Sequence, residues 1–398
     1  MPTKPVLLAA LSLGAFVVSL HAAPPQLTTI ASGLNNPRGL AFAPNGNLYV
    51  AEAGLGAGDG HGGFAVGVGF TGSITEIQGV TTTQPTARRI VTGLVSVGDT
   101  ENGFPEAIGP DGLAIHGTGG IYVTLGESAA GVAASGATLS ATAAAEFGRL
   151  IKLTPSGNWK AIADVGDFNY QWALANKNAP WAPAGQFPDA NPYGVLAVAG
   201  TEYVVDAGAN TLSEVRADGS LRLIAFFPNP LFPAAPGGPL VIPISDSVPT
   251  CVAKGPDGFL YVGTLAFGAN FARFGPSAPP FWKTLPPQSK IYRVNPAASN
   301  QFLTDADVWA SAFSPITACA FGPGALYITE YVTQQSNFVT GDVVRIAINS
   351  DGSAGARTTL GTDALVAPNG LALGTGGAVY VSNFSISSGG GEVVRVNW

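Results

Sequence analysis

The stretch Pro37–Phe42, PRGLAF, is followed after the turn APNGN by Leu48–Glu52, LYVAE. This succession of a short apolar segment and an aromatic-led segment returns five more times along the chain. The other copies begin at Pro110, Pro192, Pro249, Pro315 and Pro368, and their second segments contain Tyr122, Tyr203, Tyr261, Tyr327 and Tyr380. A phrase repeated at intervals of tens of residues is typical of a repeat architecture, in which each copy is one supersecondary unit.

Each copy continues into further segments that are predicted to be strands. A third strand is expected at residues 72–77, 149–153, 211–216, 290–294, 342–346 and 392–396. A fourth is expected near residues 88–91, 160–165, 222–226, 307–310 and 357–360. Many of these segments alternate apolar and polar residues, as half-buried strands do. Four short antiparallel strands per unit predict an all-β fold, a six-bladed β-propeller.

The two ends of the chain complement each other in this scheme. The last copy stops after its third strand, and residues 27–34 resemble the fourth-strand segment of the first copy at residues 89–94. We therefore predict that the N-terminal strand completes the C-terminal blade and closes the ring, because an open ring would leave unpaired strand edges. Residues 24–398 are expected to form a single propeller domain.

Residues 1–23 have the pattern of a secretory signal peptide. Lys4 supplies a positive start, residues 6–20 are apolar, and cleavage is expected after Ala22 or Ala23. The apolar run is shorter than the roughly 20 residues that a membrane-spanning helix needs. The sequence therefore predicts a secreted or periplasmic protein without membrane association, and we expect a monomer.

Composition narrows the classes of partner. The chain has 18 basic and 25 acidic residues, a net charge of −7, which argues against nucleic-acid binding because no basic footprint is present. Hydrophobic residues make up 46% of the chain, enough for a large core. Cys251 and Cys319 are compatible with one disulfide or with two buried thiols. Histidine occurs only three times, which argues against His-rich metal centres.

The long connections are predicted to lie on one side of the disc, which we call the loop face. In an up-and-down blade, the connection between strands two and three and the connection to the next blade emerge on the same side. These connections are residues 54–69, 128–146, 264–289 and 331–340 within blades, and residues 95–109, 166–191 and 228–248 between blades. Loops on a rigid scaffold commonly carry binding sites, so a small-molecule or protein ligand is expected here.

Eight polar residues are predicted to line the channel mouth on the loop face. Four lie near the start of first strands, namely Arg38, Asp111, Tyr193 and Asn369, and four end second strands, namely Glu52, Asp206, Glu330 and Asn383. The second group could form a Ca²⁺ site, because oxygen ligands without histidine suit a hard cation. The alternative is that these residues pair with Arg38 or cap neighbouring loop backbone. No Ser/His/Asp arrangement is credible, since His61 falls in a loop and His116 in a turn on the opposite face.

Several of these segments resemble the ScyD/ScyE family of exported NHL-like propellers. The resemblance covers nearly the whole mature chain and is carried by residues 31–42, 49–54, 191–194, 203–212, 248–250, 382–384 and 389–395. It implies the fold and export more than any reaction. Asp111 stands where a His is common in that family, so a His-dependent site is not carried over.

Two classes of function follow from these observations. The first is a binding or scaffold protein of the ScyD/ScyE type that acts through its loop face, as an accessory to extracellular assembly of a scytonemin-like pigment. The second is a Ca²⁺-dependent lactonase, similar to gluconolactonase-related propellers, with the carboxylate ring at the channel mouth.

Overall fold

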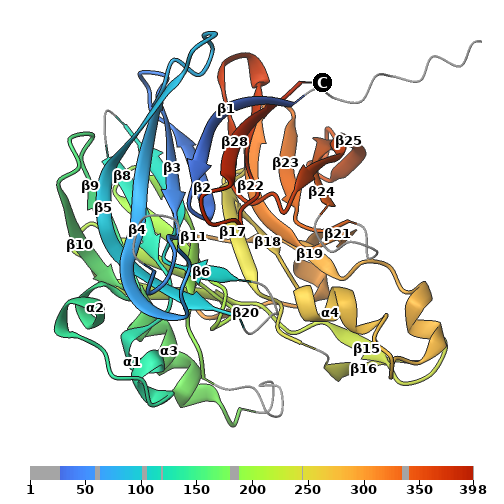
Figure 1. Cartoon of the computed structure of the whole chain (residues 1–398). Helices are drawn as coiled ribbons and strands as arrows, with labels where there is room; N and C mark the ends of the chain where they lie inside the picture. Colours follow the sequence, from blue (N-terminus) through green and yellow to red (C-terminus); the bar gives the residue numbers. More distant parts are fainter. Residues whose placement is uncertain are drawn as a thin grey trace, which may run out of the picture.

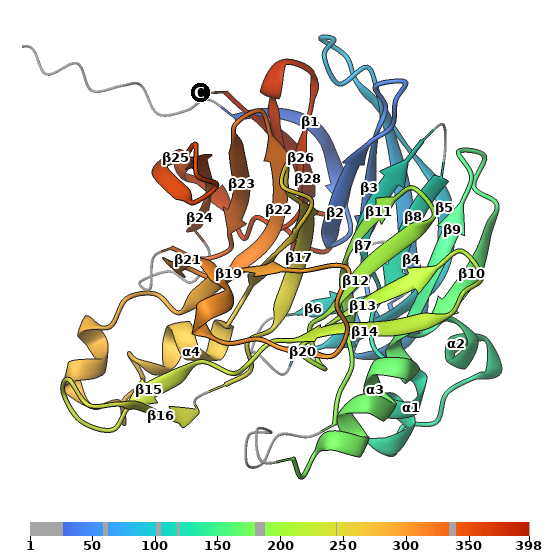
Figure 2. The same cartoon turned by 180° about the vertical axis from the view of Figure 1, so that it is seen from behind.

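The computed structural model describes residues 27–58, 63–100, 105–117, 120–179, 188–243, 245–333 and 340–397. Their strands form six antiparallel blades around a central axis, which confirms the predicted six-bladed β-propeller (Figure 1, Figure 2). The predicted signal peptide and His61 lie outside the described residues.

The blades are numbered in chain order, and the innermost strand of each begins at or near the repeated Pro. Blade 1 contains β2 (Pro37–Phe42), β3 (Leu48–Glu52), β4 (Gly67–Gln78), β5 (Thr86–Asp99) and an added β6 (Glu106–Ile108). Blade 2 contains β7 (Pro110–His116), β8 (Gly120–Leu125), β9 (Arg149–Leu153) and β10 (Trp159–Asp164). Blade 3 contains β11 (Pro192–Val198), β12 (Thr201–Asp206), β13 (Thr211–Arg216) and β14 (Leu221–Phe226).

The second half of the chain repeats this order. Blade 4 contains β17 (Pro249–Lys254), β18 (Leu260–Thr264), β19 (Ser289–Val294) and β21 (Val308–Phe313). Blade 5 contains β22 (Ile316–Gly322), β23 (Ala325–Glu330), β24 (Thr340–Ile348) and β25 (Ala354–Val366). Blade 6 contains β26 (Leu371–Leu373), β27 (Val379–Asn383) and β28 (Gly391–Val396), and its outermost strand is β1 (Leu27–Leu34).

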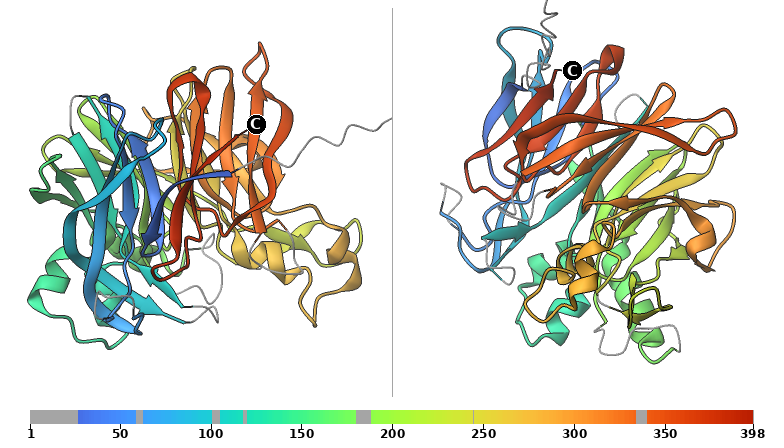
Figure 3. Two further views of the ribbon diagram at one scale, coloured as in Figure 1. Left: turned by 45° about the horizontal axis from the view of Figure 1, so that its top comes forward. Right: turned by 90° about the vertical axis from the view of Figure 1, so that its right-hand side faces the viewer.

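The ring closes as the sequence predicts. Strand β1 runs antiparallel to β28, from Leu27 opposite Val396 to Leu34 opposite Gly391 (Figure 3). A second link between distant segments joins blades 3 and 4, because β20 (Gln301–Phe302), which lies between β19 and β21, pairs in parallel with β14. Both contacts give an edge strand a partner and so limit edge-to-edge association.

The core lies between the blades. The described residues form a large apolar cluster at each of the six contacts between neighbouring blades. The repeated tyrosine of the second strand belongs to this layer and is at most 9% exposed in every blade. Burying a large apolar side chain contributes about 1.5–3 kcal/mol, so these six interfaces supply most of the stabilisation.

Glycines let the innermost strands meet closely around the axis. A Cβ added at Gly112, Gly194 or Gly370 would overlap the backbone of the next blade. Cys251 and Ala318 occupy the equivalent register positions in blades 4 and 5. Small residues at this level therefore narrow the channel and bring the residues just before them close together.

The large insertions project from one side of the disc, the predicted loop face (Figure 1). Segments expected to be loops contain short helices, and Ser128 and Ser140 cap two of them. The elements on this face are α1 (Ala129–Ala134), α2 (Ala141–Glu146), α3 (Val165–Asn176), α4 (Phe267–Ala272), the 3₁₀ helix η1 (Pro280–Thr284), β15 (Leu231–Pro233) and β16 (Leu240–Pro243). Two further 3₁₀ turns are η2 (Asp305–Asp307) and η3 (Thr375–Gly377). No helix of the described residues is both long and apolar enough to cross a membrane.

Candidate functional site at the channel mouth

The four predicted residues that end second strands make the same hydrogen bond in four different blades. Each side-chain oxygen accepts from a backbone N–H in the segment that leads into the first strand of its own blade. The bonds are Asn35 N to Glu52 Oε2 at 2.8 Å, Asn191 N to Asp206 Oδ1 at 2.7 Å, Ser314 N to Glu330 Oε1 at 2.6 Å and Val366 N to Asn383 Oδ1 at 2.7 Å. These side chains therefore fix the loop-face ends of strands one and two within each blade.

Both carboxylate oxygens of Glu52 accept further hydrogen bonds. Its fully buried carboxylate also accepts from Thr75 Oγ1 at 2.5 Å and from Arg89, at 3.0 Å from Nε and 2.6 Å from Nη2. Arg89 comes from β5 of the same blade, so the pairing with Arg38 that the sequence suggested as an alternative does not form at Glu52. Because so many donors surround this buried carboxylate, we assign it a role in stabilising the fold.

Asp206 anchors a loop-face helix in the same way. It accepts from Ala209 N at 2.9 Å and from Asn169 Nδ2 of α3 at 2.9 Å. Burial raises the pKa of Asp206 to about 7, although these hydrogen bonds act to lower it. Burial also raises the pKa of Glu330. Burial within two separate blades accounts for both raised pKa values, and neither of them requires a shared ligand.

The oxygens of the four residues accept backbone hydrogen bonds in four separate blades, and this geometry gives the calcium prediction no support. Within the part of the chain that the structure describes, no group of three or more His, Cys, Asp or Glu side chains could hold a metal ion. Capping of neighbouring backbone, the alternative given with the calcium prediction, is the arrangement that the hydrogen bonds show.

The other four predicted residues occupy one level of the channel. Each directly precedes the small residue that closes the channel in its blade. Sequence reasoning omitted two members of this ring, Thr250 of blade 4 and Thr317 of blade 5, which hold the same register position. Threonine is less conspicuous than a charged residue. Its position directly before Cys251 or Ala318, which match the glycines of the other blades, could have identified it as a member of the ring. The complete ring is Arg38, Asp111, Tyr193, Thr250, Thr317 and Asn369.

Arg38 is the fixed cation of this ring. Its side chain is buried, and Nη2 donates to the carbonyl of Ala107 at 2.9 Å and to Glu106 Oε1 at 3.1 Å. Its Nε lies 3.7 Å from Asp111 Oδ1, an ion pair too long to be a hydrogen bond. Glu106 belongs to the added strand β6, which the sequence did not predict, and this strand brings the second carboxylate to the mouth.

Tyr193 and Asn369 bridge the ring. Asn369 Nδ2 donates to the Tyr193 hydroxyl oxygen at 2.6 Å, which links blades 3 and 6 across the axis. Burial raises the pKa of Tyr193 to about 12, so the phenol keeps its proton at neutral pH. Because the oxygen accepts from Asn369, the phenolic hydrogen remains available as a donor.

Asp111 carries an acceptor without a partner. It is 2% exposed, and its Oδ2 accepts no hydrogen bond from any described residue. Burial raises its pKa to about 7, against the lowering effect of Arg38. The carboxyl group therefore titrates near neutral pH while facing a charged neighbour.

Glu127 and Tyr331 complete the polar surroundings, and sequence reasoning missed both. Glu127 has a positive φ of 65°, and its N–H donates to Asn191 Oδ1 at 3.1 Å. Burial raises the pKa of Glu127 to about 8, and the nearby acids Asp189 and Asp111 raise it further. Blade 2 lacks an acid at the end of its second strand, and Glu127 follows two residues later, which was the available signal. Burial also raises the pKa of Tyr331, which interacts electrostatically with the Arg38 cluster.

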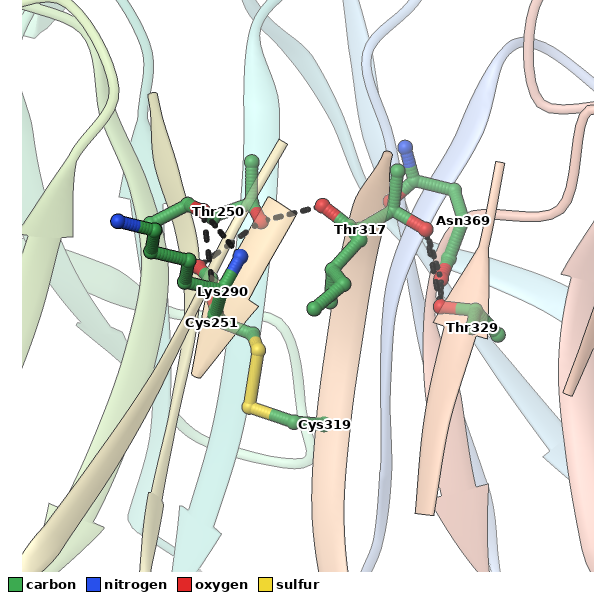
Figure 4. Close-up of a disulfide and its surroundings, with 10 residues drawn as sticks. Thr250, Cys251, Lys290, Thr317, Cys319, Thr329 and Asn369 are labelled. Atoms are coloured by element: carbon green, nitrogen blue, oxygen red, sulfur yellow. Dashed lines mark hydrogen bonds between the residues drawn. A yellow bond between two sulfur atoms is a disulfide. The ribbon is translucent and has the colours of Figure 1, made fainter. Parts of the chain in front are cut away.

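Below the mouth, the inner strands enclose a small cavity of about 90 Å³. Its polar lining includes Asp111, Tyr193, Thr250, Thr317 and Asn369. The wall is tied together by hydrogen bonds from Thr250 Oγ1 to the carbonyl of Ile316 at 2.7 Å and from Thr329 Oγ1 to the carbonyl of Asn369 at 2.7 Å (Figure 4).

A disulfide joins the same wall. Cys251 of β17 and Cys319 of β22 are bridged across the contact between blades 4 and 5, with a Cα–Cα distance of 5.6 Å (Figure 4). The two cysteines, left open by the sequence, are therefore paired. Together, the disulfide and the threonine bonds hold this half of the channel rigid.

The fold and this mouth define a six-bladed β-propeller with a buried polar ring on its loop face. No protein-family model and no curated protein matches the chain. Among solved structures it is similar to a putative oxidoreductase (glucose dehydrogenase) from Thermus thermophilus, at 15% identity and a TM-score of 0.51 over 94% of this chain and 99% of the other. It is equally similar to the PQQ-bound aldose sugar dehydrogenase from Streptomyces coelicolor, at 11% identity and a TM-score of 0.51 over 94% and 99% of the chains. A gluconolactonase from Xanthomonas campestris aligns at 9% identity and a TM-score of 0.48 over 94% and 89%. The two structures with a TM-score of 0.51 support the propeller fold, and identities this low do not establish the activity.

Proposed function

We propose that this propeller binds an uncharged, hydroxyl-rich small molecule at the loop-face mouth of its channel. The observation that carries the proposal is a set of unfilled hydrogen-bonding atoms in one place. Asp111 Oδ2 and Arg38 Nε are buried without a hydrogen-bond partner among the described residues. Asp111 lines the cavity, and Arg38 Nε lies 3.7 Å from its Oδ1. Buried polar atoms in native proteins are nearly always hydrogen-bonded, so an open acceptor on a residue that lines a cavity indicates a group that enters it.

Hydroxyl groups suit this set because they donate and accept. Asp111 Oδ2 accepts, whereas Arg38 Nε and the Tyr193 O–H donate. The surrounding charges disfavour an added anion, since Arg38 already pairs with the carboxyl groups of Glu106 and Asp111. The cavity of about 90 Å³ is smaller than the pockets of roughly 300–1,000 Å³ that hold a whole small ligand, so it takes one hydroxyl-bearing end of the ligand. The remainder would lie among the loop-face segments.

Calorimetric titration with neutral monosaccharides and sugar lactones tests the proposal, with glucuronate as the charged comparison. The neutral compounds should bind and glucuronate should bind more weakly. Asp111→Asn and Tyr193→Phe should each weaken binding about tenfold, because a lost hydrogen bond to a charged or buried partner costs about 1.5 kcal/mol or more.

Asp218→Asn is the matched control, because Asp218 lies in an exposed turn between strands three and four. It should bind like the wild type. The proposal is wrong if no neutral compound binds, or if binding is unaffected by both mouth substitutions.

One observation favours a hydrolytic version of this function. A carboxyl group that titrates near pH 7 in a cavity is suited to general acid–base catalysis, and Asp111 has this property. If Asp111 acts as the base on a lactone, the rate should rise as pH increases through about 7. This rise should be absent in Asp111→Asn, whereas a pH profile unchanged by the substitution would exclude the role.

Export, ScyD/ScyE membership and a contribution to pigment assembly belong to the same proposal. The disulfide supports export, because such bonds persist in oxidising compartments. N-terminal sequencing of the protein recovered outside the cytoplasm should begin at Ala23 or Pro24. Loss of an extracellular pigment on gene deletion, restored by wild type and not by Asp111→Asn, would support the accessory role.

A further inference from the structure

A row of side chains crosses the blades on the side away from the loop face. It begins at the repeated second-strand tyrosine and continues to the residues directly opposite on strands three and four. In blade 1 the row is Tyr49, Glu76 and Arg88, and in blade 3 it is Tyr203, Glu214 and Arg222. In both blades the acid and the arginine form an ion pair, at 3.4 Å and 2.7 Å respectively.

Blades 4, 5 and 6 have an arginine opposite the tyrosine instead, namely Arg293, Arg345 and Arg395. Blade 2 differs from these blades in its fourth strand. Tyr122 is opposite Lys152, and Lys152 is opposite Lys160. Two like charges directly opposite each other on neighbouring strands destabilise a sheet. Neither lysine forms a salt bridge with a described residue. Blade 2 therefore places two cations opposite each other, whereas the corresponding arginines of blades 5 and 6 lie opposite Thr358 and Thr28.

One nearby acid compensates only part of this charge. Glu202 of blade 3 is buried and interacts electrostatically with Lys152 and His116. Lys152 also stacks over its own row partner, with Nζ 5.0 Å from the centre of the Tyr122 ring. Lys160 and His116 are exposed, so the blade 2 row keeps an excess of basic groups in a chain whose net charge is −7.

The row lies in an open groove of about 790 Å³ at the turn ends of blade 2. Trp159, which is 38% exposed, lines this groove. Thr154 and Asn158 add a hydroxyl and an amide. The groove is thus too large for a lone inorganic anion, and it combines cations, an exposed aromatic ring and neutral hydrogen-bonding groups.

We propose that this blade 2 groove is a second binding site, for an acidic oligosaccharide. Lysine ammonium groups pair with the carboxylates of uronic-acid units, an indole ring packs on the apolar face of a sugar, and the amide and hydroxyl groups bind sugar hydroxyls. The site is independent of the channel mouth and lies on the other side of the disc.

Calorimetric titration with tetragalacturonate tests this site, with maltotetraose as the neutral oligosaccharide and citrate as the simple carboxylate. Tetragalacturonate should bind at least tenfold more tightly than either. Lys160→Glu should weaken its binding at least tenfold without loss of thermal stability, because it places opposite charges on facing strands. Trp159→Ala should weaken binding of tetragalacturonate and leave that of citrate unchanged.

Lys254→Glu is the matched control, since it makes the same charge change at an exposed turn end of blade 4. It should bind tetragalacturonate like the wild type. Equal weakening by Lys254→Glu would show general charge attraction and overturn the proposal. Equal affinity for citrate and tetragalacturonate, with no effect of Trp159→Ala, would also overturn it. Asp111→Asn should leave this binding intact, which separates the groove from the mouth.

Discussion

At the scale of single residues, two buried carboxylates in blades 1 and 2 show how structural and binding roles differ. Glu52 accepts hydrogen bonds from backbone, threonine and arginine donors, and these occupy both of its oxygens. Asp111 has an ion pair with Arg38 and an Oδ2 with no hydrogen-bond partner among the described residues. The sequence predicts both acids at the channel mouth on the loop face. Only their hydrogen-bond partners in the structure distinguish them.

Glu52→Ala should destabilise the fold severely. The substitution leaves the Asn35 N–H and the Thr75 hydroxyl without their acceptor, and each buried polar group left unsatisfied costs about 1–3 kcal/mol. Urea unfolding should show this loss, whereas Asp351→Ala in an exposed turn should change the free energy of unfolding by about 0.5 kcal/mol or less. A loss below about 1 kcal/mol for Glu52→Ala would contradict the structural role.

Asp111 should make stability depend on pH. Folding raises its pKa from 3.8 to about 7, so the folded state binds a proton that the unfolded state has already lost between these values. Its contribution to stability is therefore complete below about pH 4 and is lost as pH rises through about 7. The slope for one proton is at most about 1.4 kcal/mol per pH unit.

Urea unfolding of wild type and Asp111→Asn at several pH values between 4 and 8 measures this effect. The variant should lose less stability than the wild type as pH increases. Parallel curves for the two proteins would show that Asp111 does not titrate in this range.

At the scale of elements, the inner strands decide the shape of the mouth. Four of the six carry a glycine where neighbouring blades touch, and blades 4 and 5 are joined there by the disulfide. The bridge closes a separation of 68 residues in sequence. In the chain-entropy treatment, a loop of this length contributes up to about 4 kcal/mol by restricting the unfolded chain.

Cys251→Ala/Cys319→Ala should lower the free energy of unfolding by about 2–4 kcal/mol. Chemical denaturation with and without reductant gives the comparison. Reductant should lower the stability of the wild type and have no effect on the double variant. A wild type that is indifferent to full reduction of the bond would contradict the prediction.

At the scale of the whole molecule, closure of the ring depends on one N-terminal strand. Strand β1 buries Ile30, Ala31 and Leu34 against blades 1 and 6 and covers the edge of β28. Without it, blade 6 would expose an unpaired strand, which promotes association between chains.

A chain that begins at Asn35 should therefore aggregate or unfold well below the melting temperature of the mature protein. Adding a synthetic peptide of residues 27–34 should restore part of the thermal stability by strand complementation. Scanning calorimetry with the peptide and with a scrambled peptide tests this. A truncated chain that is monomeric and as stable as the mature protein would contradict the closure argument.

The sequence by itself determined the architecture. A phrase with strand periodicity, repeated six times, has to be buried against its neighbours, and the missing last strand has only the N-terminal segment as its equivalent. The tertiary structure decided which polar residues are free to act. Glu52, Asp206, Glu330 and Asn383 look like ligands in sequence, yet local backbone donors occupy them in separate blades. Arg38, Asp111, Tyr193 and Asn369 meet only because close packing of the inner strands brings distant segments to one level. The reason is that strand pattern is a local property of the chain, whereas the hydrogen-bond partner of a buried polar group comes from wherever the fold places its neighbours.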